Sequence, residues 1–175
     1  LDFGAPEPGR LPERLRTPDK TIALDHPYFI AALAAVDFVQ AQTPLNHLHL
    51  IGRRHVRSNN TWLHNASRLV KGKDRCTLMI HPDDARARNL GDGSMAEVSS
   101  RSGAVTLPVE VTDDMMPGTV SIPHGWGHNL PGVSMAVAQA HAGVSINDLT
   151  DETALDPLSG NAAFSGVAVA VRAAG

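Results

Sequence analysis

The chain has 175 residues, of which 42% are hydrophobic and 19% are charged, and its formal net charge is -3. This length is sufficient for one domain with a buried core, and the net charge excludes a generally basic coat protein for nucleic acid. The 15 glycines and 12 prolines predict many turns, and therefore a mainly β fold with few helices.

The chain contains a single cysteine, Cys76. One cysteine excludes internal disulfides and any four-cysteine zinc or iron–sulfur site within this chain. It is compatible with a reducing compartment, and we expect a cytoplasmic location. No apolar run approaches the roughly 20 residues that a membrane-spanning helix needs. The first residue is leucine, so we expect the sequence to be part of a longer chain.

The N-terminal residues, 1–44, are rich in proline and charge, and we expect them to lead into a domain formed by residues 45–175. Within the lead-in, residues 26–42 (HPYFIAALAAVDFVQAQ) predict a short helix, with Pro27 near its start, where a missing N–H is tolerated. Residues 45–52 (LNHLHLIG) alternate apolar and polar side chains, which predicts a strand with one buried face.

Two elements are predicted between residues 76 and 91. Residues 76–81 (CTLMIH) are mostly apolar, which predicts a strand buried on both faces with Cys76 in the core. Residues 81–91 (HPDDARARNLG) predict one or two turns of helix. Pro82 suits the first turn, and Gly91 can adopt the left-handed conformation that ends a helix.

The clearest β pattern lies between residues 91 and 123. A Ser-Gly pair at 102–103 and a Pro-Gly pair at 117–118 predict turns, and valines and a leucine alternate strictly between the two pairs. Residues 164–173 (FSGVAVAVRA) alternate again. Six or seven strands, one helix and no βαβ repetition predict a closed or nearly closed β-barrel, in which strand edges are hidden.

Positive charge is concentrated in one segment. Residues 46–75 carry seven Lys or Arg and one Asp, whereas residues 76–130 carry three Arg and seven acidic residues. Residues 131–171 carry four acidic residues and no Lys or Arg. This polarity indicates an anionic partner or an acidic neighbouring surface.

The basic segment begins with residues 50–65, LIGRRHVRSNNTWLHN. A strand that ends in glycine allows the backbone to approach a ligand closely, and arginine forks match phosphate oxygens in bidentate fashion. The amides of Asn59 and Asn60 can pair with the edge of a heterocycle, and Trp62 offers a stacking face. The set suits a nucleotide or pyrophosphate ligand; the alternative is a solvated basic loop with an asparagine turn.

Two further segments are candidate ligand contacts. Residues 123–129 (PHGWGHN) follow a strand and offer donors of mixed character, which suits a loop that lines a polar ligand, although a plain surface loop is equally compatible. Asn147 can cap a turn locally or face inward toward a ligand. The nine histidines include His47 and His49 on one strand face, but their spacing matches no metal-binding motif, and we predict no metal site.

The sequence has no nucleophile elbow, phosphate-binding P-loop or dinucleotide glycine fingerprint. Three stretches taken together resemble a known family: LIGRRHVRSNNTWLHN, then HPDDARARNLGDGSMAEVSSRSGAVTLPVEVTDDMMPGTVSIPHGWGHN, then NDLTDETALDPLSGNAAF. Roughly residues 45–172 resemble the molybdopterin-dinucleotide-binding domain that ends the catalytic subunits of the dimethyl-sulfoxide-reductase superfamily, and the lead-in is formate-dehydrogenase-like.

The resemblance implies a double-psi β-barrel that holds the guanine dinucleotide arms of a pterin cofactor carrying molybdenum or tungsten. It implies that the metal is ligated by earlier domains of the parent oxidoreductase, so this chain would contain no catalytic residue and no metal ligand. The expected partners are the cofactor and the remaining domains of the catalytic polypeptide, with no membrane and no nucleic acid. Alone, the chain is expected to catalyse nothing.

The resemblance also implies a set of cofactor contacts: Gly52, Arg53, Arg54, His55, Arg57, Ser58, Asn59, Asn60, His124, Trp126, Gly127, His128, Asn129, Asn147 and Phe164. The chain departs from the family near its end, where relatives commonly have a proline, an aromatic residue and then a lysine. Here Phe164 keeps the aromatic position, but Ser165 stands in place of the lysine.

Two other functions fit the residues less well. A freestanding double-psi barrel could act as a binding or interaction module for a nucleotide or nucleic acid through the basic segment. It would lack the exposed apolar flank expected of a domain taken from a larger enzyme. A small enzyme of the aspartate-decarboxylase barrel type would need a Gly-Ser self-cleavage site, which is absent at a matching position.

Overall fold

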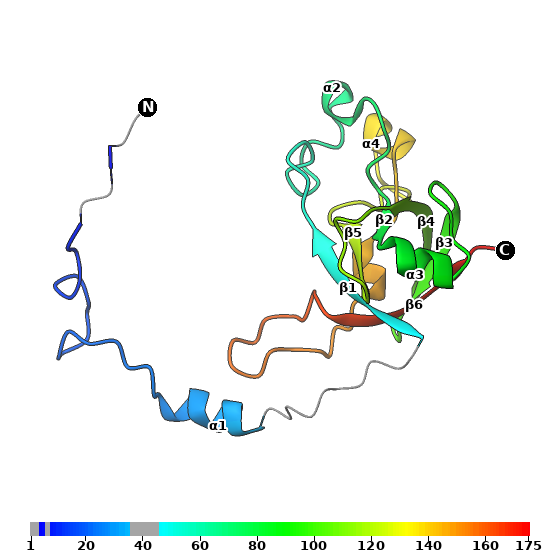
Figure 1. Ribbon diagram of the computed structural model, residues 1–175. Helices are drawn as coiled ribbons and strands as arrows, with labels where there is room; N and C mark the ends of the chain where they lie inside the picture. Colours follow the sequence, from blue (N-terminus) through cyan, green and yellow to red (C-terminus); the bar gives the residue numbers. More distant parts are fainter. Residues whose placement is uncertain (1–3, 6–7, 36–45) are drawn as a thin grey trace. The chain divides into compact units, whose positions relative to one another are not determined.

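The computed structural model describes residues 4–5, 8–35 and 46–175 (Figure 1). The chain divides into two compact units, Leu1–Gln40 and Ala41–Gly175. The first unit contains α1 (Pro27–Ala35), which begins where the sequence predicts a helix. The rest of that predicted helix, and the predicted domain boundary between residues 44 and 45, lie outside the described residues.

The second unit is a closed barrel of six strands. They are β1 (His47–Arg53), β2 (Leu78–Ile80), β3 (Met95–Ser99), β4 (Ala104–Val111), β5 (Thr119–Pro123) and β6 (Val167–Ala173). Around the barrel the order is β1-β5-β2-β4-β3-β6. The β1–β5 and β2–β4 pairs are parallel and the other four are antiparallel. The predicted mainly β fold with short helices and a double-psi barrel is confirmed.

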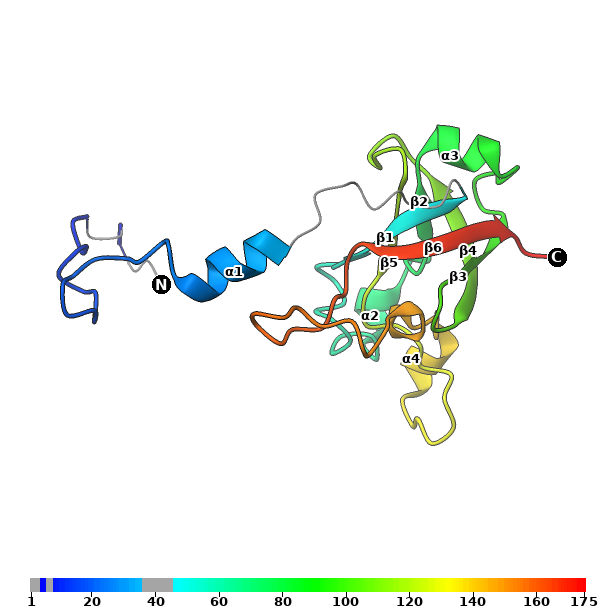
Figure 2. The ribbon, with the colours of Figure 1, turned by 90° about the horizontal axis from the view of Figure 1, so that it is seen from below.

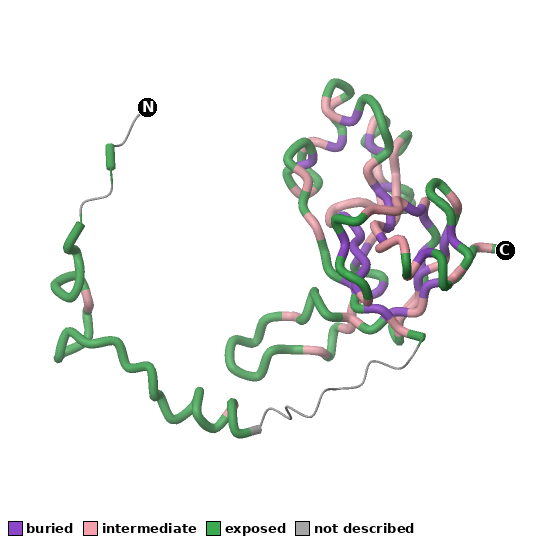
Figure 3. Tube along the Cα trace, viewed as in Figure 1, coloured by how far each residue is buried: buried purple, intermediate pink, exposed green. Residues whose placement is uncertain are grey.

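The alternation of the strands places their apolar side chains inside the barrel. In β1, Leu48 and Leu50 are buried whereas His49 between them is exposed. All five residues of β5 are buried, and this strand pairs with β1 on one side and β2 on the other. Buried positions therefore follow the strands, and the α1 segment is exposed (Figure 3). Removal of this apolar surface from water is the main force that closes the barrel.

Short helices join the strands: α2 (Ser67–Val70), α3 (Pro82–Ala87), α4 (Ala136–Ala140) and the 3-10 helix η1 (Ile146–Leu149). Helices α3 and α4 lie on opposite sides of the barrel (Figure 2). The His81 ring caps α3, because its Nδ1 accepts a hydrogen bond of 3.1 Å from the backbone N–H of Asp83. The predicted end of this helix was wrong: the left-handed residue is Asn89, with φ 54°, and not Gly91. None of the described helices is long and apolar enough to cross a membrane.

Three connecting segments position the site. We call residues 54–66 the arginine loop, residues 124–129 the glycine loop and residues 150–166 the arm (Figure 1). The backbones of the arginine loop and the glycine loop approach each other closely at Asn60 and Gly125. A Cβ atom on Gly125 would lie 2.6 Å from the carbonyl carbon of Asn60 and closer still to its oxygen, and Gly125 has φ +93°. Only glycine permits this backbone-to-backbone contact.

Candidate functional site

A cleft of about 260 Å³ opens at the end of β1. Six of the predicted contact residues line it, from four separate segments of the chain: Gly52, Arg53, Arg54, His124, Asn147 and Phe164. The parallel pairing of β1 with β5 brings two of these segments together, because Gly52 lies beside Ile122 in the register. The backbone N–H of His124 then donates to the carbonyl of Arg53 at 2.9 Å.

Three lining residues were not predicted: Ile146, Thr150 and Ser165. Thr150 lies one turn beyond Asn147 and donates its hydroxyl hydrogen to the Asn147 carbonyl at 2.9 Å. Its spacing from Asn147 was a usable signal in the sequence. Ile146 gave no such signal, since an isoleucine before a polar turn is as typical of a core residue as of a residue that lines a cleft.

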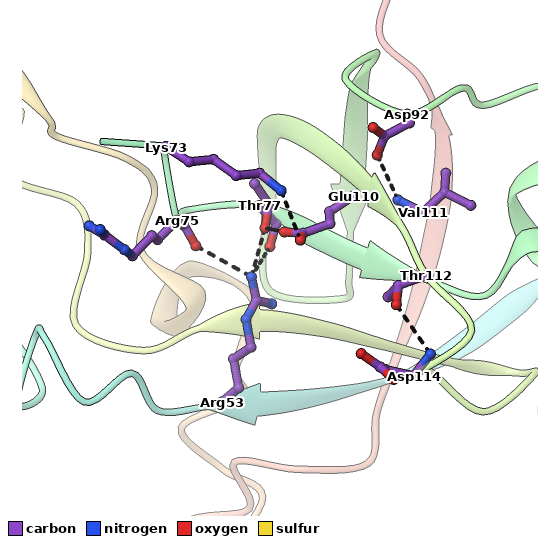
Figure 4. Close-up of polar contacts among 9 residues, drawn as sticks. All are labelled: Arg53, Lys73, Arg75, Thr77, Asp92, Glu110, Val111, Thr112 and Asp114. Carbon is purple, nitrogen blue, oxygen red and sulfur yellow. Dashed lines mark hydrogen bonds and ion pairs between the residues drawn. The ribbon is translucent and has the colours of Figure 1, made fainter. Parts of the chain in front are cut away.

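Arg53 lies at the cleft, but its guanidinium is used inside the protein (Figure 4). One terminal nitrogen donates to the carbonyl of Ser121 at 2.5 Å. The other donates to the carbonyl and the hydroxyl of Thr77, both at 2.8 Å, and to the carbonyl of Arg75 at 3.3 Å. The side chain therefore connects β1 to β5 and to the segment that enters β2.

Glu110 completes this network. It accepts a hydrogen bond of 2.7 Å from the Thr77 hydroxyl and pairs with Lys73 at 3.1 Å. The bond from Thr77 is the main cause of a lowered Glu110 pKa, with Lys73 and Arg53 acting in the same direction. Burial lowers the pKa of Arg53, and the Glu110 carboxylate opposes that shift. The network thus holds a partly buried cation in place by hydrogen bonds to β5 and to the segment before β2.

The other two arginines of the cluster are available to a ligand. Arg54 is exposed and donates to the side-chain oxygen of Asn60. Arg54 also lines an open depression of about 500 Å³ on the arginine loop, and so joins it to the cleft. Arg57 is exposed, and its guanidinium has no hydrogen-bond or ion-pair partner among the residues that the structure describes. Two forked cations therefore remain for an anionic group.

The arginine loop is shaped by its own polar residues. The buried Ser58 hydroxyl donates to the carbonyl of His55 at 2.9 Å, and the His55 ring accepts from the backbone N–H of Arg57 at 3.1 Å. Asn59 and Asn60 adopt positive φ angles of 43° and 62°, a conformation that asparagine tolerates better than most residues. Of this group His55, Asn59 and Asn60 line the depression, whereas Ser58 acts inside the turn.

The residues of the glycine loop face three different parts of the protein. His124 reaches the cleft. Trp126, Gly127 and Asn129 instead line a separate cavity of about 290 Å³ beside residues 143–145. His128 is buried and bonded to His64 on the arginine loop. Of the five loop residues predicted as contacts, His124 alone lines the cleft, and no local pattern distinguishes it from its neighbours.

Metal-binding chemistry is not provided by the part of the chain that the structure describes, since no group of three or more His, Cys, Asp or Glu side chains could hold an ion there. Cys76 is buried as predicted, and its Sγ accepts a hydrogen bond of 3.3 Å from the backbone N–H of Val144. Burial raises the pKa of this thiol, which keeps it protonated and unreactive.

Replacement of Gly52 by alanine is expected to weaken ligand binding without affecting folding. Gly52 does not have a positive φ, and an added Cβ would meet only the Ile146 side chain, at an ordinary 3.8 Å. The new methyl group would therefore occupy the cleft. We expect a loss of about tenfold in ligand affinity with unchanged thermal stability, measured by titration calorimetry and by Tm.

Gly91→Ala is the matched control for this change, since Gly91 also lacks a positive φ and its added Cβ would meet nothing within 4 Å. It should alter neither quantity. Equal affinity of the Gly52→Ala and Gly91→Ala proteins would mean that the ligand does not approach the end of β1.

Comparison with known proteins identifies relatives of one kind. A family model described as "Molydopterin dinucleotide binding domain" matches residues 48–168. Dimethyl sulfoxide/trimethylamine N-oxide reductase from Rhodobacter capsulatus is 34% identical over 102 residues, which are 57% of this chain and 12% of that protein. Biotin sulfoxide reductase from Cereibacter sphaeroides is 32% identical over 80 residues, 45% of this chain and 11% of that protein.

A third curated relative is the trimethylamine-N-oxide reductase of Haemophilus influenzae, 40% identical over 52 residues, which are 30% of this chain and 6% of that protein. The chain thus spans about a tenth of the length of these relatives. Among solved structures, acetylene hydratase from Pelobacter acetylenicus superimposes with a TM-score of 0.61 at 20% identity, over 73% of this chain and 18% of that one. At this identity the likeness shows the fold alone.

Proposed function

The chain belongs to the molydopterin dinucleotide binding domain family, and from this premise we propose that the cleft at the end of β1 holds the dinucleotide of its cofactor, molybdopterin guanine dinucleotide. Binding this cofactor is the function of the domain. The residues at the cleft fit the group. Arg54 offers a forked donor to the diphosphate. Asn147 and His124 offer polar atoms to the ring systems, and the exposed Phe164 offers a flat apolar face. Arg57 lines neither the cleft nor the depression, but it is exposed on the same loop and offers a second forked donor.

The gathering of these residues is the observation that carries the proposal. Arg54, His124, Asn147 and Phe164 come from four segments that span more than one hundred residues, and they line one cleft. Asn147 is exposed, and its side-chain amide has no hydrogen-bond partner among the described residues. Gly52 leaves room beside it. When bound, the cofactor supplies the metal centre, which is ligated outside this chain.

The domain is part of a larger catalytic subunit, because the relatives that it matches are far longer. We propose that the parent enzyme is a molybdenum or tungsten oxidoreductase of the dimethyl-sulfoxide-reductase superfamily. In it, this domain would bind and orient the dinucleotide arms while other domains ligate the metal and bind substrate. The formate-dehydrogenase-like assignment and the cytoplasmic location stay predictions.

Exposed apolar side chains support a position within a larger protein. On the arginine loop, Val56 is 90% and Trp62 is 81% exposed. On the arm, Leu155 is 56% and Phe164 is 59% exposed. Several large apolar groups on two protruding segments are typical of a surface that another domain covers, and a freestanding module would leave them in water.

The basic segment offers less free charge than its composition suggests, which disfavours the nucleic-acid alternative. Arg53 donates to internal carbonyls, Lys73 is paired with Glu110, and Arg75 donates to the carbonyls of Leu69 and Lys71 at 3.2 and 3.1 Å. A nucleic-acid surface requires a continuous row of free cations. Binding of one anionic group by Arg54 and Arg57 needs only two free cations.

Guanosine diphosphate is a probe for the proposed site, because it carries the guanosine and the diphosphate of the dinucleotide. We expect both Asn147→Ala and Arg57→Ala to weaken its binding about fivefold to thirtyfold, since each removes one or two hydrogen bonds of about 1 kcal/mol. Titration calorimetry of the 175-residue chain measures this.

Asn161→Ala, on the exposed tip of the arm, is the matched control and should bind like wild type. Unchanged affinity in both Asn147→Ala and Arg57→Ala would refute the assignment of the site. Tighter binding of a single-stranded oligonucleotide than of guanosine diphosphate, with a steep salt dependence, would favour the nucleic-acid module instead. In the full-length enzyme, the molybdenum and guanine contents should fall together in the Asn147→Ala protein.

A further inference from the structure

The arginine loop and the glycine loop are joined by a buried pair of imidazole rings. His64 is 2% and His128 is 7% exposed. The Nδ1 atom of His64 lies 2.6 Å from the Nε2 atom of His128, and the rings are nearly perpendicular at 87°. The pair therefore forms one direct hydrogen bond between two segments that are 64 residues apart in the sequence.

Further contacts fix the same end of the arginine loop. The His64 ring packs on the Trp126 ring, with centroids 4.1 Å apart. The next residue, Asn65, accepts hydrogen bonds from the backbone N–H groups of Val137 and Ala138 at 3.1 and 3.2 Å, and so caps α4. The arginine loop is thereby held between the glycine loop and α4. Its ligand-facing residues, Arg54 and Arg57, lie at the other end of the same loop.

The surroundings of the two rings favour an uncharged pair. In a neutral pair one ring donates its N–H and the other accepts. A first added proton would place a positive charge on a buried ring, and a second would leave two N–H groups facing each other. Trp126 packs against His64, and the α4 end is held through Asn65; neither contributes a carboxylate. The described residues thus provide no counter-charge for a protonated pair.

We propose that His64 and His128 are positioning residues, whose neutral pair holds the arginine loop against the glycine loop in the arrangement that binds the dinucleotide. This inference rests on the proposed function of the cleft. Neither ring touches the ligand itself. Their effect is to keep Arg54 at the cleft and to maintain the close contact between Asn60 and Gly125.

The titration of the pair makes the stability of the folded chain depend on pH. Burial, and second the neighbouring His128 ring, lower the pKa of His64 from 6.5 to about 4; burial also lowers the pKa of His128. The unfolded chain takes up protons below about pH 6.5, whereas the folded chain stays neutral. The contribution of the neutral pair to the stability of the fold is therefore fully present above pH 6.5, and it is lost as the pH falls from 6.5 toward 4.

Three variants separate the hydrogen bond from the ring. His64→Asn keeps a polar atom near the position of Nδ1 but does not titrate. His64→Phe keeps the packing on Trp126 but removes the bond. His141→Asn removes a histidine whose ring lies 3.8 Å from Asp74 and makes no bond to the pair, and it serves as the control.

At pH 7.5, His64→Phe should speed amide hydrogen exchange at least about tenfold in residues 54–66 and 124–129, with the barrel strands unchanged, and should weaken guanosine diphosphate binding by a similar factor. His64→Asn should restore both to within about twofold of wild type. Between pH 7.5 and 5, the wild-type folding equilibrium constant should fall roughly 30-fold more than that of His64→Asn. His141→Asn should follow wild type.

The proposal is overturned if His64→Phe leaves exchange in both loops at the wild-type rate, or if His64→Asn retains the wild-type pH dependence. If His64→Phe does not fold, the pH dependence of His64→Asn compared with that of wild type still tests the proposal. Faster loop exchange with unchanged nucleotide affinity would reject the link to the cleft. Failure of wild type to bind guanosine diphosphate would count against the proposed function alone, because the exchange and pH measurements need no ligand.

Discussion

Gly125→Ala is expected to lower the free energy of unfolding by about 2–6 kcal/mol and to abolish nucleotide binding. The residue has φ +93°, a conformation that costs a non-glycine residue about 1–3 kcal/mol. Its new Cβ would also overlap the backbone carbonyl of Asn60, and overpacking of this kind costs a further ~1–3 kcal/mol. Since both partners are backbone, neither can move without displacing its loop, and the cleft would lose its shape.

Gly118→Ala separates the two causes. Gly118 also has a positive φ, +83°, but an added Cβ there would meet nothing within 4 Å. It should show only the backbone cost, about 1–3 kcal/mol, and should bind guanosine diphosphate normally. Equilibrium unfolding in urea and titration calorimetry measure the two effects. Equal stability of the two variants would mean that the arginine and glycine loops do not touch as described.

Arg53→Ala is expected to destabilise the barrel by about 2–4 kcal/mol. The change leaves the carbonyls of Ser121 and Thr77 without their donor, and each unsatisfied buried group costs about 1–3 kcal/mol. Arg53→Lys should recover less than half of the loss, because one ammonium group cannot reproduce a planar fork that reaches both β5 and the segment before β2. Urea unfolding of the three proteins measures the series.

Arg57→Ala is expected to have the opposite effect to Arg53→Ala: it should weaken nucleotide binding and leave the stability of the barrel unchanged. Its guanidinium is exposed and has no partner among the described residues, so its loss should leave stability within about 0.5 kcal/mol of wild type while nucleotide affinity falls. Wild-type stability in Arg53→Ala, together with a loss of more than about tenfold in affinity, would show instead that Arg53 contacts the phosphates directly.

Local sequence patterns were sufficient for most of the strands. The period-2 alternation of Leu48 and Leu50 decides which face of β1 is buried, and the Pro-Gly pair at 117–118 marks the start of β5. These signals work because a strand needs only its own residues to define a buried face, and a turn needs only residues that accept its φ angles. The end of α3 was less certain, since Asn89 and Gly91 both accept a left-handed conformation.

The sequence by itself determined that a cluster of arginines and amides follows a strand that ends in glycine. Only the tertiary structure decided what each member does. Arg53 and Arg54 are adjacent and chemically identical, and both line the cleft. The guanidinium of Arg53, however, donates to carbonyls of residues 22 to 68 positions away, whereas Arg54 is exposed. His64 likewise gained its partner 64 residues away. Barrel closure fixes such long-range neighbours, and because they depend on how all six strands pair, no local pattern contains them.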